Sequence, residues 1–281
     1  MLKLISYLLN QGIATNRNIC PDLAEGVRGL PKLTDIPCST GCTACVDVCP
    51  TDAISVFKIE ETGHIKLDLG LCIGCGYCVD ACPTGTIANN PSTRVAVSRR
   101  EDLVLTTASA PPGNIAQDAT SVMVSAPDSL EKAKWFSRSV AARVVATGCS
   151  ACDMELGAAG NPIFDMERFG VQIVASPRFA DALIVTGPIS KGMQAALSSC
   201  YGAMASPRIV IALGTCAISG GVHRGGYADA NGIEELLPVN VYIPGCPPHP
   251  WSIIHGLLLA MGKEHLAPRS VARFSTVRIE K

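Results

Sequence analysis

Two runs of closely spaced cysteines near the start of the chain constrain its fold more than any other feature. They read C-x3-C-x2-C-x3-C-P and C-x2-C-x2-C-x3-C-P, and their cysteines are Cys38, Cys42, Cys45, Cys49, Cys72, Cys75, Cys78 and Cys82. The last three cysteines of the first run recur 33 residues later, and Thr51-Asp52-Ala53-Ile54 has a counterpart in Thr84-Gly85-Thr86-Ile87. Such an internal repeat predicts two copies of one supersecondary unit, related by a pseudo-twofold axis.

The spacing of these cysteines indicates iron–sulfur clusters. The second run is the bacterial ferredoxin pattern, in which the cysteine before the proline ligates the other of two clusters. One predicted 4Fe-4S cluster is therefore held by Cys38, Cys42, Cys45 and Cys82. The other is held by Cys72, Cys75, Cys78 and Cys49. Zinc sites need only four ligands each, so zinc does not explain the repeat.

The first run departs from the usual pattern at one place. Three residues separate Cys38 from Cys42, where two are usual. Either the extra residue bulges from the loop, or it makes Cys38 a poor ligand and the first cluster labile. The spacing alone leaves both readings open.

The composition argues against several other classes of protein. A net charge of -1 gives no electrostatic case for binding nucleic acid. Charged residues make up only 17% of the chain, against about 25% in ordinary soluble domains, which indicates a buried α/β core plus subunit contacts. From the first residues we expect no signal peptide, and the grouping of the 14 cysteines in short runs favours metal over disulfides.

Two apolar segments bear on membrane association. No uninterrupted apolar run approaches the roughly 18–20 residues of a spanning helix, and the segment from Ile253 to Met261 is better read as a core helix. At the amino terminus, apolar residues fall at helical spacing: Leu2, Ile5, Leu8 and Leu9. The predicted helix either lies in a membrane interface or packs on a partner or on the chain's own core.

A second set of cysteines lies in the later part of the chain. Buried apolar runs at 143–146, 171–175, 182–185, 208–213 and 241–243 read as strands. They alternate with helical stretches expected at 128–140 and near 164–169, 189–201 and 249–262, which predicts a parallel, doubly wound sheet. Cys149, Cys216 and Cys246 each follow a predicted strand, so they meet at the carboxyl edge of the sheet. With Cys152 they form a four-thiolate set that suits a third cubane cluster.

These features divide the chain into four parts. Residues 1–37 form an N-terminal helix and approach segment, and residues 38–105 form an α+β two-cluster ferredoxin domain with a hairpin within 54–69. Residues 106–127 are rich in Ala, Ser, Thr and Pro and read as a linker. Residues 128–281 form the α/β domain, for which we expect a flavodoxin-like doubly wound sheet.

Several motifs in the α/β part resemble one known family. They are Phe164 to Gly170, Ser176 to Asp181, Val185 to Pro188, Gly214-Thr215-Cys216 and Pro238 to Pro248. This part is similar to the small subunits shared by respiratory complex I and the membrane-bound (group four) nickel–iron hydrogenases, including formate hydrogenlyase. The cysteine runs, with Gly12 to Thr15 and Arg28 to Pro31, resemble the two-cluster ferredoxin subunit of the same complexes. Those subunits are usually separate chains, whereas here they are fused.

The resemblance implies a function. Cys149 and Cys152 form C-x2-C, as in hydrogenase small subunits, whereas complex I small subunits carry adjacent cysteines. The quartet Cys149, Cys152, Cys216 and Cys246 would then ligate a proximal cluster facing a nickel–iron centre in a partner large subunit. Glu155 either helps proton movement at the subunit boundary or is a structural carboxylate. Cys20 and Cys200 match no ligand position and are expected to be free thiols.

We therefore expect an electron-transfer subunit, with no complete active site of its own, in a multisubunit hydrogenase-type oxidoreductase. Three 4Fe-4S clusters would connect a ferredoxin or formate dehydrogenase type of donor protein to the nickel–iron large subunit. Further partners would be membrane-embedded subunits, which would hold the chain in the cytoplasm, peripherally on the inner face of the cell membrane. One alternative is a complex-I-like quinone-reducing or hydrogenase-related complex without nickel. A second is a non-enzymatic ferredoxin-like carrier.

Overall fold

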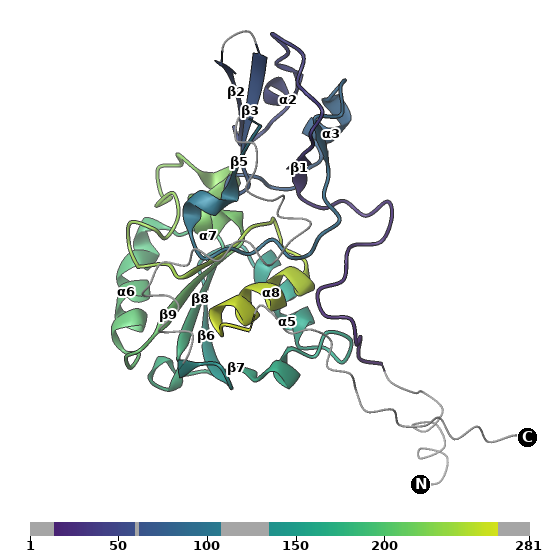
Figure 1. The fold of residues 1–281 in the computed structure, drawn as a ribbon. Coiled ribbons are helices and arrows are strands. Elements are labelled where there is room, and N and C mark those ends of the chain that lie inside the picture. Colours follow the sequence, from purple (N-terminus) through teal and green to yellow (C-terminus); the bar gives the residue numbers. More distant parts are fainter. Residues whose placement is uncertain (1–13, 60–61, 108–134, 264–281) are drawn as a thin grey trace, which may run out of the picture.

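The computed structural model of the chain describes residues 14–59, 62–107 and 135–263. Figure 1 shows two lobes, with a small lobe, formed from β1 to β5, projecting beyond one end of a larger sheet lobe, residues 135–263. The predicted N-terminal helix and nearly all of the predicted linker 106–127 lie outside the described residues.

The small lobe contains the two cysteine runs. Its strands are β1 (Pro31–Leu33), β2 (Ile54–Ile59), β3 (Thr62–Asp68), β4 (Ile87–Asn89) and β5 (Val104–Thr106). The expected hairpin is present, because β2 pairs antiparallel with β3, and β5 adds to the other edge of β3. Two short helices, α2 (Ala44–Asp47) and α3 (Tyr77–Ala81), occupy equivalent places in the two repeats and contact each other, while β1 pairs with β4. A 3-10 turn, η1 (Arg100–Leu103), precedes β5.

The sheet lobe is built on five parallel strands. They are β6 (Val140–Ala146), β7 (Val171–Ile173), β8 (Ala182–Thr186), β9 (Ile209–Leu213) and β10 (Val241–Ile243). Their order in the sheet is β10-β9-β8-β6-β7, and every neighbouring pair is parallel. Numbered along the chain this is 2-1-3-4-5, the doubly wound order with its switch point between the first and third strands. The expected α/β fold is confirmed.

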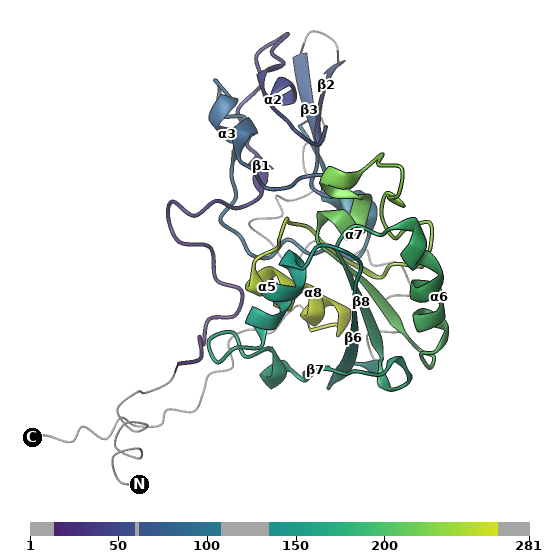
Figure 2. The ribbon, with the colours of Figure 1, turned by 180° about the vertical axis from the view of Figure 1, so that it is seen from behind.

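Helices cover both faces of this sheet. They are α5 (Ala151–Ala159), α6 (Gln194–Gly202), α7 (Thr215–Ser219) and α8 (Pro250–Ala260), with 3-10 turns η2 (Met166–Phe169), η3 (Pro177–Phe179), η4 (Lys191–Met193) and η5 (Gly221–His223). Every residue of β8 and β9 is buried, as expected for central parallel strands. Alternate side chains pack on opposite faces, Ile184 against α5 and α8, and Leu183 against α6 and α7. Figures 1 and 2 show α5 and α8 together on one side of the sheet and α6 on the other.

Two helix predictions differ from the structure, and two helices were not predicted. The sequence did not indicate α5 or α7, and the helix expected near 164–169 is only the 3-10 turn η2. Residues 128–134 of the helix expected at 128–140 lie outside the described residues, and its last residue, Val140, begins β6. Within the described ranges, none of the helices has the length and apolar character needed to span a bilayer.

The two lobes are tied together by backbone hydrogen bonds. Val97 and Tyr242 exchange N–H···O bonds of 3.0 and 2.8 Å, which adds the chain near residue 97 antiparallel to the edge strand β10. The carboxyl edge of the sheet faces the small lobe, because Thr215 and Ser219, just after β9, donate hydrogen bonds to carbonyls of that lobe. That edge is where a doubly wound fold builds its sites.

Candidate functional site: three sets of thiols

The first thiol set lies in the small lobe. Its four cysteines are Cys38, Cys42, Cys45 and Cys82. Burial, followed by the nearby Cys38 sulfur, raises the pKa of Cys45 to about 11, with smaller contributions from Cys82 and Cys42. Burial, followed by Cys42 and Cys82, also raises the pKa of Cys38, so its thiol stays with the set.

The extra residue before Cys42 is absorbed in a tight turn. The N–H of Cys42 donates to the carbonyl of Ser39 at 3.1 Å, and Gly41 adopts a positive φ of 79°. Glycine reaches that region without steric cost. Of the two readings that the spacing left open, the turn geometry favours the bulge.

The second thiol set adjoins the first. It contains Cys72, Cys75, Cys78 and Cys49. Burial raises the pKa of Cys72 to about 12, and a hydrogen bond of 3.4 Å from the N–H of Gly74 opposes that rise. Another backbone N–H, from Ala53, donates to the Cys49 sulfur at 3.3 Å. The Cys45 sulfur is close enough to contribute to the raised pKa of Cys78, so the two sets are neighbours.

The third set gathers at the carboxyl edge of the sheet. Cys149 and Cys152 lie at the start of α5 just after β6, Cys216 lies in α7 just after β9, and Cys246 lies just after β10. Burial raises the pKa of Cys152 to about 12, with smaller contributions from Cys246 and Cys149. Cys216 and Cys246 are hydrogen-bonded thiols, and that bond raises the pKa of Cys216 and lowers that of Cys246.

A glycine lies directly against each of two sulfurs of the third set. A Cβ atom built on Gly214 would lie 2.5 Å from the Sγ of Cys152, and one built on Gly221 would lie 2.8 Å from the Sγ of Cys216. Both glycines have positive φ, 88° and 56°. At these two positions the loops that carry the third set therefore have no room for a side chain beside the cysteine sulfur.

The grouping of the thiols fits cubane clusters better than single ions. Throughout the part of the chain that the structure describes, no three His, Cys, Asp or Glu side chains close on one metal ion. In a cubane each thiolate binds a different iron, so the four sulfurs stand around a cage rather than around a point. Three separate sets of four thiols, each drawn from distant segments, have the composition that such cages need.

A hydrogen-bonded junction connects the second and third sets. The hydroxyl of Thr215, next to Cys216, donates to the carbonyl of Cys72 at 2.8 Å. One turn later in α7, the Ser219 hydroxyl donates to the carbonyl of Gly70 at 2.7 Å. All three thiol sets therefore stand in series, from the small lobe into the sheet lobe.

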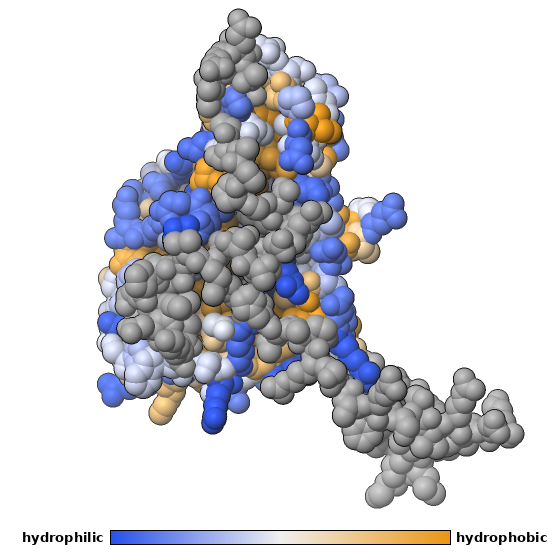
Figure 3. Space-filling view, in the orientation of Figure 1, coloured by the Kyte–Doolittle hydropathy of each residue, from blue (hydrophilic) through white to orange (hydrophobic). Residues whose placement is uncertain are grey.

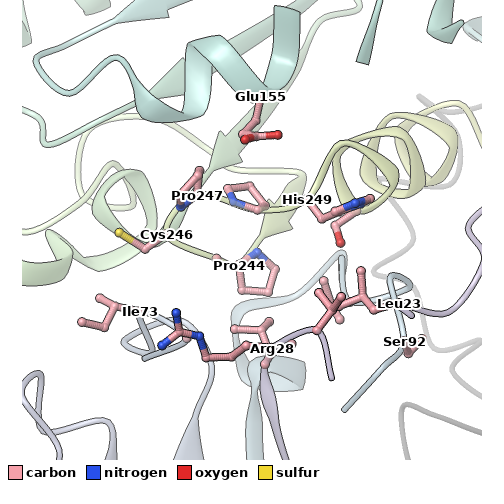
Figure 4. Close-up of a pocket in the computed structure, with 17 residues that line it drawn as sticks. Leu23, Arg28, Ile73, Ser92, Glu155, Pro244, Cys246, Pro247 and His249 are labelled. Carbon is pink, nitrogen blue, oxygen red and sulfur yellow. The ribbon is translucent and has the colours of Figure 1, made fainter. Parts of the chain in front are cut away.

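A cavity of about 290 Å³ lies beside this junction. Figure 4 shows Glu155 on one side of it and Arg28 on the other, with Cys246 and His249 between them. Arg28 donates to the carbonyl of Cys75 at 2.6 Å. His249 accepts the N–H of Trp251 at 3.2 Å, which caps α8; burial lowers the pKa of His249, and Glu155 partly offsets this. The predicted site residue Glu155 thus faces the same space as Cys246.

The two remaining cysteines lie apart from the three sets. The Cys20 thiol is buried against α8, where it donates to the carbonyl of Trp251 at 3.5 Å, and burial raises its pKa to about 11. Cys200 lies in α6.

Sequence reasoning missed the polar side chains of the junction. Thr215 and Ser219 carry no motif that identifies them, because their partners are backbone carbonyls more than 140 residues away. Sequence reasoning also missed Arg100, which forms two hydrogen bonds of 2.8 and 2.7 Å with the carboxylate of Asp68. The partner lies 32 residues away in sequence, and no local pattern indicates it.

Two families of known proteins match this chain. Residues 149–260 match the family of the NADH ubiquinone oxidoreductase 20 Kd subunit, and residues 38–86 match the 4Fe-4S dicluster domain. The two matches contain all of the cysteines of the three thiol sets.

Individual proteins are also similar. Formate hydrogenlyase subunit 7 of Escherichia coli (strain K12) is 40% identical over 120 residues, which are 43% of this chain and 47% of that protein. This chain therefore spans about half the length of that relative. The probable membrane-bound hydrogenase subunit mbhJ of Pyrococcus furiosus is 43% identical over 116 residues, 41% of this chain and 69% of that protein.

Among solved structures, a chain of the membrane-bound sulfane sulfur reductase, an archaeal respiratory membrane complex, is 28% identical with a TM-score of 0.41. The match covers 49% of this chain and 76% of that one. The two family matches, and the 43% identity that extends over 69% of the hydrogenase subunit, show the family of this chain. The chain belongs to the family of the 20 kDa subunit of NADH ubiquinone oxidoreductase and its membrane-bound hydrogenase relatives, and it carries a 4Fe-4S dicluster domain ahead of that unit.

Proposed function

We propose that this chain is the electron-transfer (small) subunit of a multisubunit, membrane-associated nickel–iron hydrogenase. It would relay electrons through three 4Fe-4S clusters between a ferredoxin- or formate-type donor and the nickel–iron site of a partner large subunit. The observation that carries the proposal is the serial arrangement of the thiol sets. The Cys45 sulfur contributes to the raised pKa of Cys78 between the first two sets, and Thr215 donates a hydrogen bond to the carbonyl of Cys72 between the second and third.

The residues of this chain would hold and tune the clusters. A bound 4Fe-4S cluster takes up and releases one electron. Its ligands must be thiolates, so the thiols of Cys72 and Cys152, whose pKa values are raised to about 12, would give up their protons as iron binds. The N–H groups of Gly74 and Ala53 would then donate to negatively charged sulfurs, which stabilises the thiolates and tunes the clusters.

The third set is the end that a large subunit can reach. Cys149 and Cys246 are solvent-exposed, whereas Cys152 and Cys216 are buried. Nearby in sequence, Met154 and Val222 are large apolar side chains with exposed fractions of 72% and 57%. We propose that the large subunit covers this surface, and the C-x2-C spacing favours a partner that carries nickel and iron. Glu155 would serve proton transfer at the same boundary.

The first set would receive electrons from the donor. It lies in the projecting small lobe, where hydrophobic residues reach the surface (Figure 3), among them Ile36 and Val48 with exposed fractions of 50% and 39%. Two relatives carry "membrane-bound" in their names. We propose by analogy that membrane-embedded subunits hold this chain peripherally on the inner face of the cell membrane.

The test is iron quantitation with electron paramagnetic resonance on the reduced protein, purified without oxygen together with its bound subunits. Three clusters correspond to about twelve irons per chain and three interacting paramagnetic signals. About eight irons and no stable large-subunit complex would identify a ferredoxin-like carrier instead. Twelve irons with a large subunit that lacks nickel would identify a complex-I-like enzyme.

A further inference from the structure

The side chain of Thr215 contacts backbone groups at or next to predicted cluster-ligand cysteines in both lobes. Thr215 is 1% exposed, and its Oγ1 lies 2.8 Å from the carbonyl oxygen of Cys72. The same Oγ1 lies 3.4 Å from the N–H nitrogen of Gly245, the residue before Cys246. Thr215 itself precedes Cys216. A single hydroxyl thus connects backbone adjoining three cysteines in the second and third sets.

The direction of these hydrogen bonds is fixed by what each group can donate. A hydroxyl has one proton, so Thr215 can donate to only one carbonyl. The Gly245 carbonyl lies farther away, at 3.2 Å, and it already accepts the backbone N–H of Thr215 at 2.9 Å. The hydroxyl therefore donates to Cys72 and accepts from the N–H of Gly245.

Ser219 provides a comparison on the same helix. It follows Thr215 by four residues, so both hydroxyls lie on one face of α7. Ser219 donates to the carbonyl of Gly70 at 2.7 Å, which helps to hold the small lobe against the sheet lobe. Its partner Gly70 is not a cysteine of the second set, whereas Cys72, the partner of Thr215, is. A substitution at Ser219 therefore tests the docking of the lobes, whereas a substitution at Thr215 tests the contact between the thiol sets.

We propose that Thr215 is a positioning residue that sets the electronic contact between the second and third thiol sets. The inference rests on the proposed function, in which both sets hold clusters. A hydrogen bond shortens the through-space gap between two covalent paths, and electronic coupling falls more steeply across a gap than along bonds. One electron leaves one site and arrives at the other; Thr215 keeps its proton, and no bond is made or broken.

The test compares four variants in the purified complex. Thr215→Val removes the hydroxyl at nearly constant volume, and Thr215→Ser retains it. Ser219→Ala removes the docking contact with Gly70 and a longer contact of 3.2 Å with the carbonyl of Thr215. Thr93→Val is a matched control, since Thr93 is also 1% exposed and donates to a backbone carbonyl, that of Pro21, at 2.9 Å. Each variant is measured for iron content, magnetic interaction between the reduced clusters, and electron transfer after a light-triggered one-electron reduction.

Thr215→Val is expected to keep its iron and the distance-dependent magnetic interaction between the second and third sites, but to transfer the electron more slowly. Thr215→Ser, Ser219→Ala and Thr93→Val should match the wild type. Equal rates in Thr215→Val and Thr215→Ser would overturn the inference, as would a loss in Ser219→Ala as large as in Thr215→Val. If Thr215→Val does not assemble, an altered rate in Thr215→Ser overturns it. A wild-type protein without three clusters would refute the proposed function itself, a separate result.

Discussion

The sulfur of Cys152 occupies the space that a side chain on residue 214 would fill, because a Cβ atom there would lie 2.5 Å from the Sγ. Gly214 also has a φ of 88°, a conformation that L-residues rarely adopt. The turn between β9 and α7 is therefore shaped around a sulfur from α5. This relationship joins segments more than 60 residues apart, and it makes the third thiol set sensitive to a single methyl group.

We predict that Gly214→Ala prevents assembly of the proposed third cluster and spares the two proposed for the small lobe. The added methyl displaces the Cys152 sulfur, so the iron content should fall from about twelve to about eight per chain. The matched control is Gly202→Ala, at a glycine of α6 with no atom within 4 Å of an added Cβ and no positive φ. Iron quantitation on both proteins checks the prediction. Full iron content in Gly214→Ala would contradict it.

Loss of the Cys152 thiol should disconnect the electron donor from the partner enzyme. We predict that Cys152→Ala abolishes donor-driven hydrogen turnover in the proposed complex, since one iron of the proposed third cluster would lose its ligand. The signals of the first two sites should persist in paramagnetic resonance spectra. Cys200→Ala, at a cysteine of α6 outside the three sets, should leave turnover unchanged. Near-normal turnover in Cys152→Ala would remove this cysteine from the electron path.

Much of this site could be predicted because its signals are local in sequence. The spacing within each cysteine run, and its recurrence after 33 residues, predicts the two ligand sets of the small lobe. The sulfurs that act on Cys45 and on Cys72 belong to the respective predicted sets, and the ligand assignment itself stays a prediction. Apolar runs gave β10 with its observed bounds and β8 to within one residue. The position of cysteines just after strands anticipated their gathering at one sheet edge, since parallel strands share that edge.

Other features lacked any local signal. Helix α7 has only five residues, too few to show a helical period, and α5 contains Gly157 and is dominated by small residues. The contact between Thr215 and Cys72 joins residues 143 apart in sequence, and its acceptor is a backbone carbonyl that every residue has. Tertiary packing alone creates such contacts, so the sequence could not reveal them.

The ion pair between Arg100 and Asp68 should stabilise the fold far more than the neighbouring ion pair between Arg99 and Asp102 does. Their side chains are only 18% and 17% exposed and form a bidentate pair. We predict that Arg100→Ala lowers the free energy of unfolding by about 2–3 kcal/mol, since it leaves a largely buried carboxylate unpaired. Arg99→Ala is the control, because Arg99 pairs with Asp102 in a solvent-screened position and its loss should have little effect. Denaturant unfolding of both variants measures these losses. Equal losses in Arg100→Ala and Arg99→Ala would show that the burial of the Arg100 pair has no energetic consequence.

Stability should fall as the pH drops from about 6.5 to about 4, owing partly to His255. Its Nδ1 accepts the N–H of Ala96 at 3.2 Å, and burial, followed by the charge of Arg94, lowers its pKa from 6.5 to about 4. In that window the unfolded chain binds a proton that the folded chain does not, so folding loses at most about 3 kcal/mol. We predict that His255→Gln, which retains an acceptor but does not titrate, shows a shallower decline in the free energy of unfolding over this range. His223→Gln, at an exposed histidine, should keep the wild-type decline. Identical slopes in His255→Gln and the wild type would exclude His255 as a source of acid sensitivity.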